Sequence, residues 1–244
     1  MHEKTDRNSP LKLLLVYPDF VEETKRNRNI PGNYSEGLAS ISAVLKAAGY
    51  AVSLLHLTWM PDRDEFLSNV RKEAPDVLGF TMRTTAMGYV SEMAGWLDEE
   101  MPDVHVSCGG YHPTLVPDEV LAIRGVDSVC VGEGEYPLRD LMDSLRDGVA
   151  RRDIESMYFK SPDGSVVRNP VRPMTEDLDE LPFPDLSIFD YKKLRTGLID
   201  TAMVMVSRGC LFSCTYCGNS QFRNVYPNRK KYARFRSPAN AIRV

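Results

Sequence analysis

The stretch Leu11-Lys12-Leu13-Leu14-Leu15-Val16-Tyr17 decides how this chain folds. It is a nearly continuous apolar run, which is typical of a strand buried on both faces of a parallel sheet. An amphipathic helix is expected next, over residues 35–48, with Gly49 as its stop. A second apolar strand is expected over residues 51–57. This order of strand, helix and strand predicts a sheet with helices packed on its faces.

The same unit repeats over the next 100 residues. Asp62, with Glu65 three residues later, predicts the start of a helix. Further strands are expected at residues 76–81, 104–108 and 128–131, and further helices at 88–100, 118–123 and 135–147. Five strands with four helical crossovers predict an α/β chain with a flavodoxin-like (Rossmann-like) doubly wound parallel sheet over residues 1–150. In such a sheet ligands bind beyond the carboxyl ends of the strands, so the functional loops should follow the strands.

Length, composition and charge narrow the class of protein. A chain of 244 residues with 43% hydrophobic content can bury a sizeable core in one or two domains. No apolar stretch is long enough to span a bilayer, and the N-terminus is charged where a signal peptide would be apolar, so we expect a cytoplasmic protein without membrane partners. The net charge of −4 argues against a dedicated nucleic-acid binder. Five cysteines, three of them clustered, favour a metal site over a disulfide framework.

Glycines gather in the loops after the fourth and fifth expected strands. These loops read Gly109-Gly110-Tyr111-His112-Pro113-Thr114 and Gly132-Glu133-Gly134-Glu135-Tyr136. One interpretation is that glycines at strand ends are needed only for the turns. The other is that they let the backbone approach a large ligand closely, because glycine has no Cβ. Because both loops lie at the same edge of the sheet, a ligand site is the stronger interpretation.

The two loops resemble those of the cobalamin-binding (B12-binding) domain of B12-dependent radical S-adenosylmethionine (SAM) proteins. That family pairs a G-G-x-H-P-T loop with a G-E-G-E loop, and both occur here. The resemblance implies that the corrin ring lies across the strand ends and that its nucleotide tail enters beside the sheet. The implied cobalamin contacts are Gly109, Gly110, His112, Thr114, Gly132, Glu133 and Gly134. The loop after the third strand would complete the pocket with Thr81, Arg83 and Thr84. His112 can also be an ordinary polar loop residue.

The first loop departs from the cobalamin-dependent mutases and methionine synthases. Those proteins place D-x-H-x-x-G after the first strand, and its histidine ligates cobalt from below. Here Asp19 is followed by Val21 at the histidine position. This departure favours the radical SAM branch over mutase chemistry, and His56 is interpreted as an ordinary strand-end residue.

Residues 151–200 are interpreted as a linker. Turn formers punctuate this segment, and a hairpin is expected around Pro162-Asp163-Gly164. The acidic stretch 177–184 is typical of a solvated connector, and it also resembles the segment that joins the two domains of B12-dependent radical SAM proteins.

Three cysteines follow at C-x3-C-x2-C spacing: Cys210, Cys214 and Cys217. Three thiolates can hold three irons of a cubane cluster and leave the fourth iron open for chemistry. A structural zinc site would need four ligands, often as two close pairs, and no second pair follows. Three unrelated buried thiols are the other alternative. An apolar strand expected at residues 202–206 would place the cysteines at a strand's carboxyl end, where a β/α barrel keeps its chemistry.

The C-x3-C-x-aromatic-C pattern resembles the radical SAM signature, with Tyr216 at the aromatic position. The resemblance implies a 4Fe-4S cluster on the three cysteines, SAM bound at the open iron, and Tyr216 beside the adenine, although Tyr216 can equally be a packing residue. It further implies a 5′-deoxyadenosyl radical, a small-molecule substrate and a reductant protein such as ferredoxin or flavodoxin.

Residues 223–236 contain six basic residues with interleaved aromatics and no acid. The simplest interpretation is a solvated loop. Contacts to an anionic substrate or cofactor, or to single-stranded nucleic acid, are the alternatives.

From Ala202 onward the chain has 43 residues, whereas a β/α barrel needs roughly 200. We therefore expect residues 201–244 to be the first unit of an incomplete radical SAM barrel, in an N-terminal fragment of a longer protein that is inactive alone. The leading hypothesis is a methyltransferase acting at an unactivated centre through methylcobalamin. Radical cyclisation or rearrangement, a non-catalytic cobalamin sensor with a vestigial cluster motif, and a flavin-binding flavodoxin-like protein are the alternatives.

Overall fold

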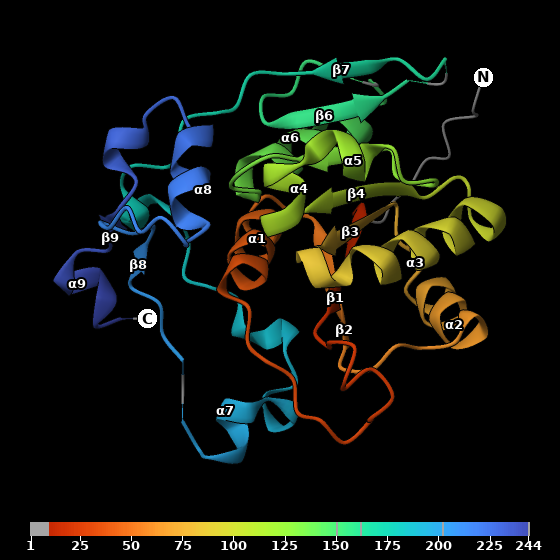
Figure 1. Ribbon diagram of the computed structural model, residues 1–244, viewed down its shortest axis with the longest axis horizontal. Coiled ribbons are helices and arrows are strands. Elements are labelled where there is room, and N and C mark those ends of the chain that lie inside the picture. The colour runs from red at the N-terminus through yellow and green to blue at the C-terminus, as the bar shows by residue number, and fades with distance from the viewer. Residues whose placement is uncertain (1–9, 150, 162, 202, 244) are drawn as a thin grey trace.

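The computed structural model describes residues 10–149, 151–161, 163–201 and 203–243 (Figure 1). Five parallel strands form most of one sheet, in the order β2-β1-β3-β4-β5, which confirms the predicted doubly wound fold. Their bounds are Lys12–Pro18 (β1), Ala51–Leu57 (β2), Val77–Thr81 (β3), His105–Gly109 (β4) and Ser128–Cys130 (β5). Within these described ranges, no helix is long and apolar enough to cross a membrane.

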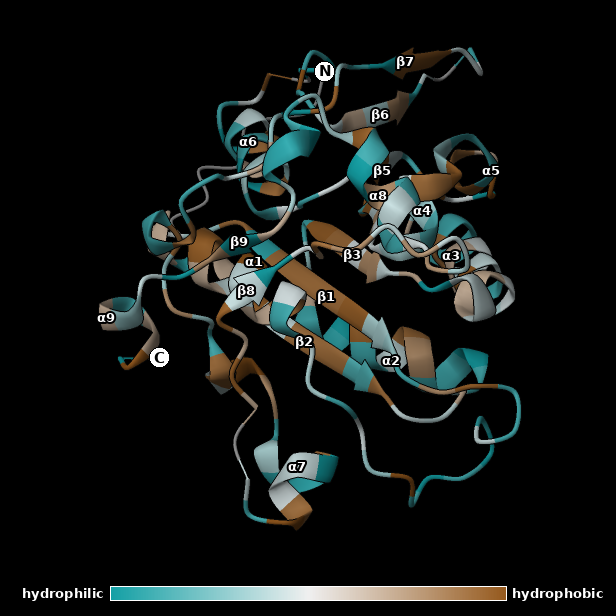
Figure 2. Ribbon diagram, turned by 60° about the vertical axis from the view of Figure 1, so that its left-hand side comes forward, coloured by the Kyte–Doolittle hydropathy of each residue, from teal (hydrophilic) through white to brown (hydrophobic). Residues whose placement is uncertain are grey.

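Helices cover both faces of the sheet. Their bounds are Glu36–Ala47 (α1), Arg63–Glu73 (α2), Met87–Glu100 (α3), Tyr111–Leu115 (α4), Pro117–Leu121 (α5) and Glu135–Arg146 (α6). Strand β1 shows why the sheet is buried on both sides. Leu14 and Val16 pack with α2, α3 and α5, whereas Leu13 and Leu15 pack with α1 and α6. Figure 2 shows the resulting apolar band along β1 and β3.

The sheet has seven strands where the sequence predicted five. The hairpin expected in the linker is present as β6 (Met157–Lys160) and β7 (Val166–Arg168), but β6 pairs antiparallel with β5 and so extends the sheet. Three residues of β5 would otherwise form an open edge with unpaired backbone groups, and the hairpin covers that edge.

The prediction of an apolar strand at residues 202–206 is wrong. Ala202 lies outside the described residues, and 203–206 are exposed and form no strand. A short strand, β8 (Ser207–Arg208), instead pairs with β9 (Arg234–Phe235). Hydrophobicity alone does not make a strand, because its backbone groups need a neighbour. Three short helices complete this part of the chain, namely α7 (Arg195–Leu198), α8 (Asn219–Val225) and α9 (Pro238–Ala241). No barrel is formed within the described residues.

The segment after the hairpin is docked on α1 through Asp185. Its carboxylate lies 2.6 Å from the Lys46 ammonium and accepts a 2.6 Å hydrogen bond from the Ser42 hydroxyl. Partial burial opposes the charge, but Lys46, Ser187 and Ser42 outweigh it and lower the pKa of Asp185 from 3.8 to about 2. The acidic linker is thus attached to the sheet domain at this point.

The low pKa of Asp185 predicts an acid-sensitive contact. Because the pKa is lower in the folded state, its contribution to stability is complete above the ordinary carboxyl pKa and is lost as the pH falls towards 2. Asp185→Asn should therefore lower the free energy of unfolding at about pH 6 and have little effect at about pH 2. Urea unfolding at both values measures this, and an equal loss at both would contradict it.

Candidate functional site

A cavity of about 570 Å³ opens at the carboxyl edge of the parallel strands. Both glycine loops reach it, although they are separated in sequence. Of the residues expected to contact cobalamin, those lining the cavity are Thr81, Gly109, Gly110, Gly132, Glu133 and Gly134. Helix α1 forms a further wall with Gly37, Leu38 and Ile41. The sequence argument that ligand-binding loops follow the strands thus leads to one concave site.

Two glycines shape this edge through positive φ angles. Gly110 has φ 99° and ψ −157°, a conformation that is essentially restricted to glycine, and a Cβ there would lie 2.9 Å from Thr81 Oγ1 and 3.2 Å from the Met82 backbone nitrogen. Gly132 has φ 94°, and a Cβ would lie 2.9 Å from the Tyr226 hydroxyl. Larger residues would therefore fill or distort the cavity edge.

The sheet presents small residues to the cavity. Gly79 and Ser107 are register partners on β3 and β4, and Cys130 on β5 lines the same space. The Ser107 hydroxyl is buried and has no hydrogen-bond partner among the described residues. Burying a hydroxyl without a partner is unfavourable, so its position in the cavity wall suits a ligand with polar groups. Burial raises the pKa of the Cys130 thiol to about 12, so this wall carries no thiolate charge.

The other predicted contacts support the loops from behind and do not line the cavity. His112 is buried, and its Nδ1 lies 3.2 Å from the Thr84 hydroxyl. Thr114 donates to the Gly110 carbonyl at 2.8 Å and accepts from the Gly132 backbone N–H at 3.0 Å. Arg83 reaches the Pro18 carbonyl at 3.3 Å. Thr114 thus connects the two glycine loops through its hydroxyl, whereas His112 and Arg83 anchor the first of these loops and the β3 loop to neighbouring segments.

The G-E-G-E loop carries an ion-pair network that the sequence did not reveal. Arg208 donates to Glu135 at 2.6 Å and to Glu133 at 3.3 Å, and it also reaches the Ser40 hydroxyl at 2.9 Å. Arg234 binds both oxygens of Glu133, at 2.7 and 3.1 Å. The network attaches the two strands that flank the cysteine segment, β8 and β9, to the predicted cobalamin loop.

Charge pairing dominates the titration of this network. Burial opposes ionisation of Glu135, but the Arg208 guanidinium outweighs it and lowers the pKa of the carboxyl. Burial likewise opposes the Arg208 charge, and Glu135 and Glu133 outweigh it and raise the pKa of the guanidinium. Both groups are therefore charged at neutral pH. The charge of each offsets most of the unfavourable burial of the other.

Residues 207–235 close one side of the cavity. In Figure 1 this segment lies beside α1 and α4. Tyr226 and Tyr232 are buried against Met174, and Phe222 stacks edge-on with Tyr111 at a centroid distance of 4.9 Å. Burial raises the pKa of Tyr232 to about 12, so its hydroxyl stays protonated in the wall.

The solvated-loop interpretation of residues 223–236 is wrong for Arg234 and Arg236, because both side chains are buried. The sequence signal for this burial was the absence of acidic residues from 223–236. Buried arginines in this segment must therefore find their counter-charges elsewhere in the fold.

One of the three predicted cluster cysteines packs on this wall. Cys210 packs against the cluster of Met174, Tyr226 and Tyr232, and all three thiols are free and partly exposed. Tyr216 is 90% exposed and lies outside the cavity wall. No three metal-binding side chains are close enough to hold a metal ion among the described residues. The thiol donor set suits an iron–sulfur cluster, but these cysteines do not converge, so the cluster and the SAM contact stay predictions.

The end of β1 contains a polar cluster in place of a cobalt-binding histidine. Asp19 accepts hydrogen bonds from Asn33, and His56 Nε2 lies 3.1 Å from its carboxylate. The His56 ring stacks on Tyr17 at a centroid distance of 4.9 Å. Neither Asp19 nor His56 lines the cavity. The interpretation of His56 as a strand-end residue agrees with this packing.

Comparison with known proteins identifies the first domain. Residues 34–142 match the B12 binding domain family. The chain is 29% identical over 213 residues to an uncharacterised methyltransferase from Pyrococcus horikoshii, covering 86% of this chain and 46% of that protein. It is 27% identical over 226 residues to an anaerobic magnesium-protoporphyrin IX monomethyl ester cyclase from Rubrivivax gelatinosus, covering 88% of this chain and 40% of that protein.

The fold is also found in a solved enzyme. The radical SAM methyltransferase TsrM from Kitasatospora setae, determined with cobalamin and a 4Fe-4S cluster bound, superimposes with a TM-score of 0.67 and 18% identity, covering 96% of this chain and 45% of that one. The chain thus spans less than half the length of these relatives.

The doubly wound sheet has a glycine-edged cavity at its carboxyl edge, and both glycine loops of that cavity lie within the residues that match the B12 binding domain family. Residues 34–142 match that family, and the chain as a whole is similar in sequence to the methyltransferase and the cyclase named above.

Proposed function

We propose that this chain binds cobalamin in the cavity at the carboxyl edge of its sheet. The observation that carries the proposal is the convergence of both glycine loops on one concave site inside the B12-binding match. Gly110 and Gly132 keep the edge open for close backbone approach, and Ser107 offers an unpartnered hydroxyl inside. The ligand's polar groups would satisfy that hydroxyl, while Leu38 and Ile41 of α1 supply apolar contact.

We further propose that the protein acts in radical SAM methyl transfer, with Cys210, Cys214 and Cys217 holding a 4Fe-4S cluster and Tyr216 contacting SAM. When bound, these groups supply one-electron reduction of SAM and a methyl-carrying cobalt. Support comes from the cysteine spacing and from the methyltransferases among the relatives. A cyclase relative keeps radical cyclisation as the second candidate. A small-molecule substrate, a reductant protein and a cytoplasmic location stay predictions.

The chain's own contribution to this chemistry is positioning. Glu133 and Glu135 hold β8 and β9, between which the three cysteines lie, against the glycine loops. Tyr226 and Tyr232 form a buried wall between Cys210 and the cavity. Such a wall would keep water from a reactive intermediate, which is the usual protein role in cofactor radical chemistry.

Metal and corrinoid analysis of anaerobically reconstituted protein tests the proposal. We expect one cobalamin and about four irons per chain. Replacing Cys210, Cys214 and Cys217 together by alanine should abolish iron binding and leave cobalamin binding intact. Cys108→Ala, at a buried cysteine in β4, is the matched control and should keep both.

Three outcomes would contradict the proposal in different ways. Cobalamin without iron in the unaltered chain would favour a sensor module over an enzyme. Zinc without corrinoid would exclude both. Bound flavin would favour a flavodoxin-like carrier.

A further inference from the structure

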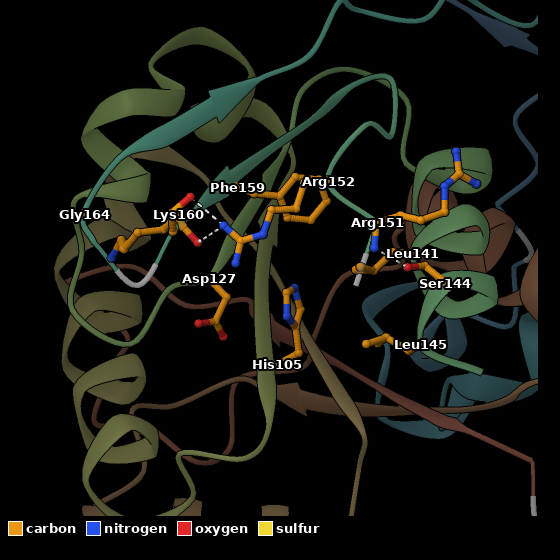
Figure 3. A pocket seen from close by; sticks show the side chains of 11 residues that line it. His105, Asp127, Leu141, Ser144, Leu145, Arg151, Arg152, Phe159, Lys160 and Gly164 are labelled. Atoms are coloured by element: carbon orange, nitrogen blue, oxygen red, sulfur yellow. Dashed lines mark hydrogen bonds between the residues drawn. The ribbon is translucent and has the colours of Figure 1, made fainter. Parts of the chain in front are cut away.

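A second cavity, of about 430 Å³, lies at the opposite edge of the sheet, where β4 and β5 begin and β6 ends (Figure 3). It shares no lining residue with the glycine-edged cavity. Its lining combines one apolar wall with charged groups of both signs. The side chains that bear on its chemistry are His105, Asp127, Leu141, Leu145, Arg152 and Phe159. Nothing in the proposed cobalamin chemistry uses this site.

Arg152 places a cation in the cavity without a paired carboxylate. Its Nη1 donates to the Ser161 hydroxyl at 2.5 Å and to the Lys160 carbonyl at 3.5 Å. These contacts orient the guanidinium, which Figure 3 shows beside Lys160 and above Asp127. Among the described residues no carboxylate lies within 4.0 Å of it. A half-buried guanidinium oriented by neutral acceptors is a ready partner for a ligand carboxylate.

Asp127 places an anion in the same cavity. Its Oδ2 accepts a 2.8 Å hydrogen bond from the Val106 backbone N–H, which anchors the carboxylate at the start of β5. No cation of the described chain lies within 4.0 Å of it. The Lys160 ammonium instead donates to the Ile123 carbonyl at 2.9 Å. Asp127 is thus held by a backbone N–H and Arg152 by a hydroxyl and a carbonyl, and the two do not pair with each other.

His105 lines the same cavity and adds no charge to it. Its Nε2 lies 2.8 Å from the Ser128 hydroxyl. Burial lowers the pKa of the imidazole, and of the two charges that act on it Asp127 raises the pKa while Arg152 lowers it. At neutral pH the ring is therefore neutral and leaves the two charges uncompensated.

The third feature is an apolar wall. Leu141 and Leu145 project from the last turns of α6, and Phe159 comes from β6. All three belong to or pack on the core of this face, so the wall is rigid. A ligand that pairs with both charges and also packs on the apolar wall must carry a negative group, a positive group and an apolar side chain.

We infer that this cavity binds a small zwitterion, an α-amino acid with an apolar side chain. Its carboxylate contacts Arg152, its ammonium contacts Asp127, and its side chain lies on Leu141, Leu145 and Phe159. The site is independent of the cobalamin proposal, because the two cavities lie at opposite edges of the sheet.

A matched ligand series tests the charge requirement by isothermal titration calorimetry on the whole chain. The probes are L-leucine, 4-methylpentanoate, which lacks the ammonium, and 3-methylbutylamine, which lacks the carboxylate. We expect L-leucine to bind with a Kd of about 1 mM or tighter, and each analogue to bind at least about tenfold more weakly. Absence of leucine binding, or equal binding of 4-methylpentanoate, would overturn the zwitterion assignment.

Two variants assign the ends of the ligand. Arg152→Gln should weaken L-leucine and 4-methylpentanoate by about tenfold and leave the amine unchanged, and Asp127→Asn should weaken L-leucine and the amine only. Arg63→Gln, at an exposed arginine paired with Glu99 and Glu100, is the control and should bind like the unaltered chain. Circular dichroism melting reports whether each variant is folded.

Saturating hydroxocobalamin should leave leucine affinity unchanged. If both variants bind leucine normally, or if cobalamin competes with leucine, the site is not this cavity and the inference is wrong.

Discussion

Glu135→Ala is expected to lower the free energy of unfolding by about 3 to 5 kcal/mol, because it removes the closest counter-charge of a buried guanidinium. Glu135 is 4% exposed and lies 2.6 Å from Arg208. Glu133, at 3.3 Å, would be the remaining carboxylate partner of Arg208 and is shared with Arg234. Urea unfolding measures the loss. Limited trypsin digestion should also cleave the region of β8 and β9 faster, because its attachment to the sheet domain is weakened.

The matched control is Glu99→Ala, which removes an exposed carboxylate paired with Arg63 and Arg124. Exposed pairs contribute about 0 to 1 kcal/mol, so this variant should differ little from the unaltered chain. If Glu135→Ala were as mild as Glu99→Ala, the network would not hold β8 and β9 on the G-E-G-E loop.

The second large effect is expected from Gly110→Ala. A Cβ at φ 99° is strained by about 1 to 3 kcal/mol, and it would also lie 3.2 and 3.3 Å from the Met82 backbone atoms, which cannot move aside as a side chain would. The loop should shift away from Thr81 and narrow the cavity. We expect lower stability and a cobalamin affinity reduced by about tenfold or more. Spectrophotometric titration with hydroxocobalamin measures the affinity, and thermal melting measures the stability.

Gly95→Ala is the control for this change. Gly95 lies inside α3, and a Cβ there meets nothing within 4 Å. Alanine also favours the helix, so this variant should be neutral or slightly stabilising and should bind cobalamin normally. Unchanged cobalamin affinity in Gly110→Ala would exclude the glycine loop from the site.

The sequence predicted the strands and loops well because their causes are local or periodic. The apolar run at 11–17 indicates burial, and the glycines at 109–110 and 132–134 indicate positions that need backbone freedom. The structure places these glycines at one cavity. The roles of His112 and Thr114 were harder to predict. A resemblance gives a residue's position in a motif, whereas its direction depends on the turn at Gly110 and the short helix α4 that follows it.

Pairings across long sequence separations were out of reach. Arg208 and Glu135 are 73 residues apart, and either residue alone is typical of a solvated surface. The hairpin was predicted, but its pairing with β5 was not, because strand partners depend on which edge the fold leaves open. For residues 203–206 the sequence predicted a strand that is absent from the structure. An apolar run forms no strand when no neighbouring strand is there to pair with it.

Local sequence was therefore sufficient for the doubly wound sheet, for the glycine loops at its carboxyl edge and for the spacing of Cys210, Cys214 and Cys217, because burial, backbone freedom and spacing depend on residues that are near one another in the sequence. Only the folded chain could show that Arg208 and Arg234 bind the G-E-G-E loop and that Arg152 and Asp127 share a cavity without pairing. The physical reason is that charge compensation depends on distances between side chains, and those distances are set when the sheet, its helices and the segment from β8 to β9 pack together.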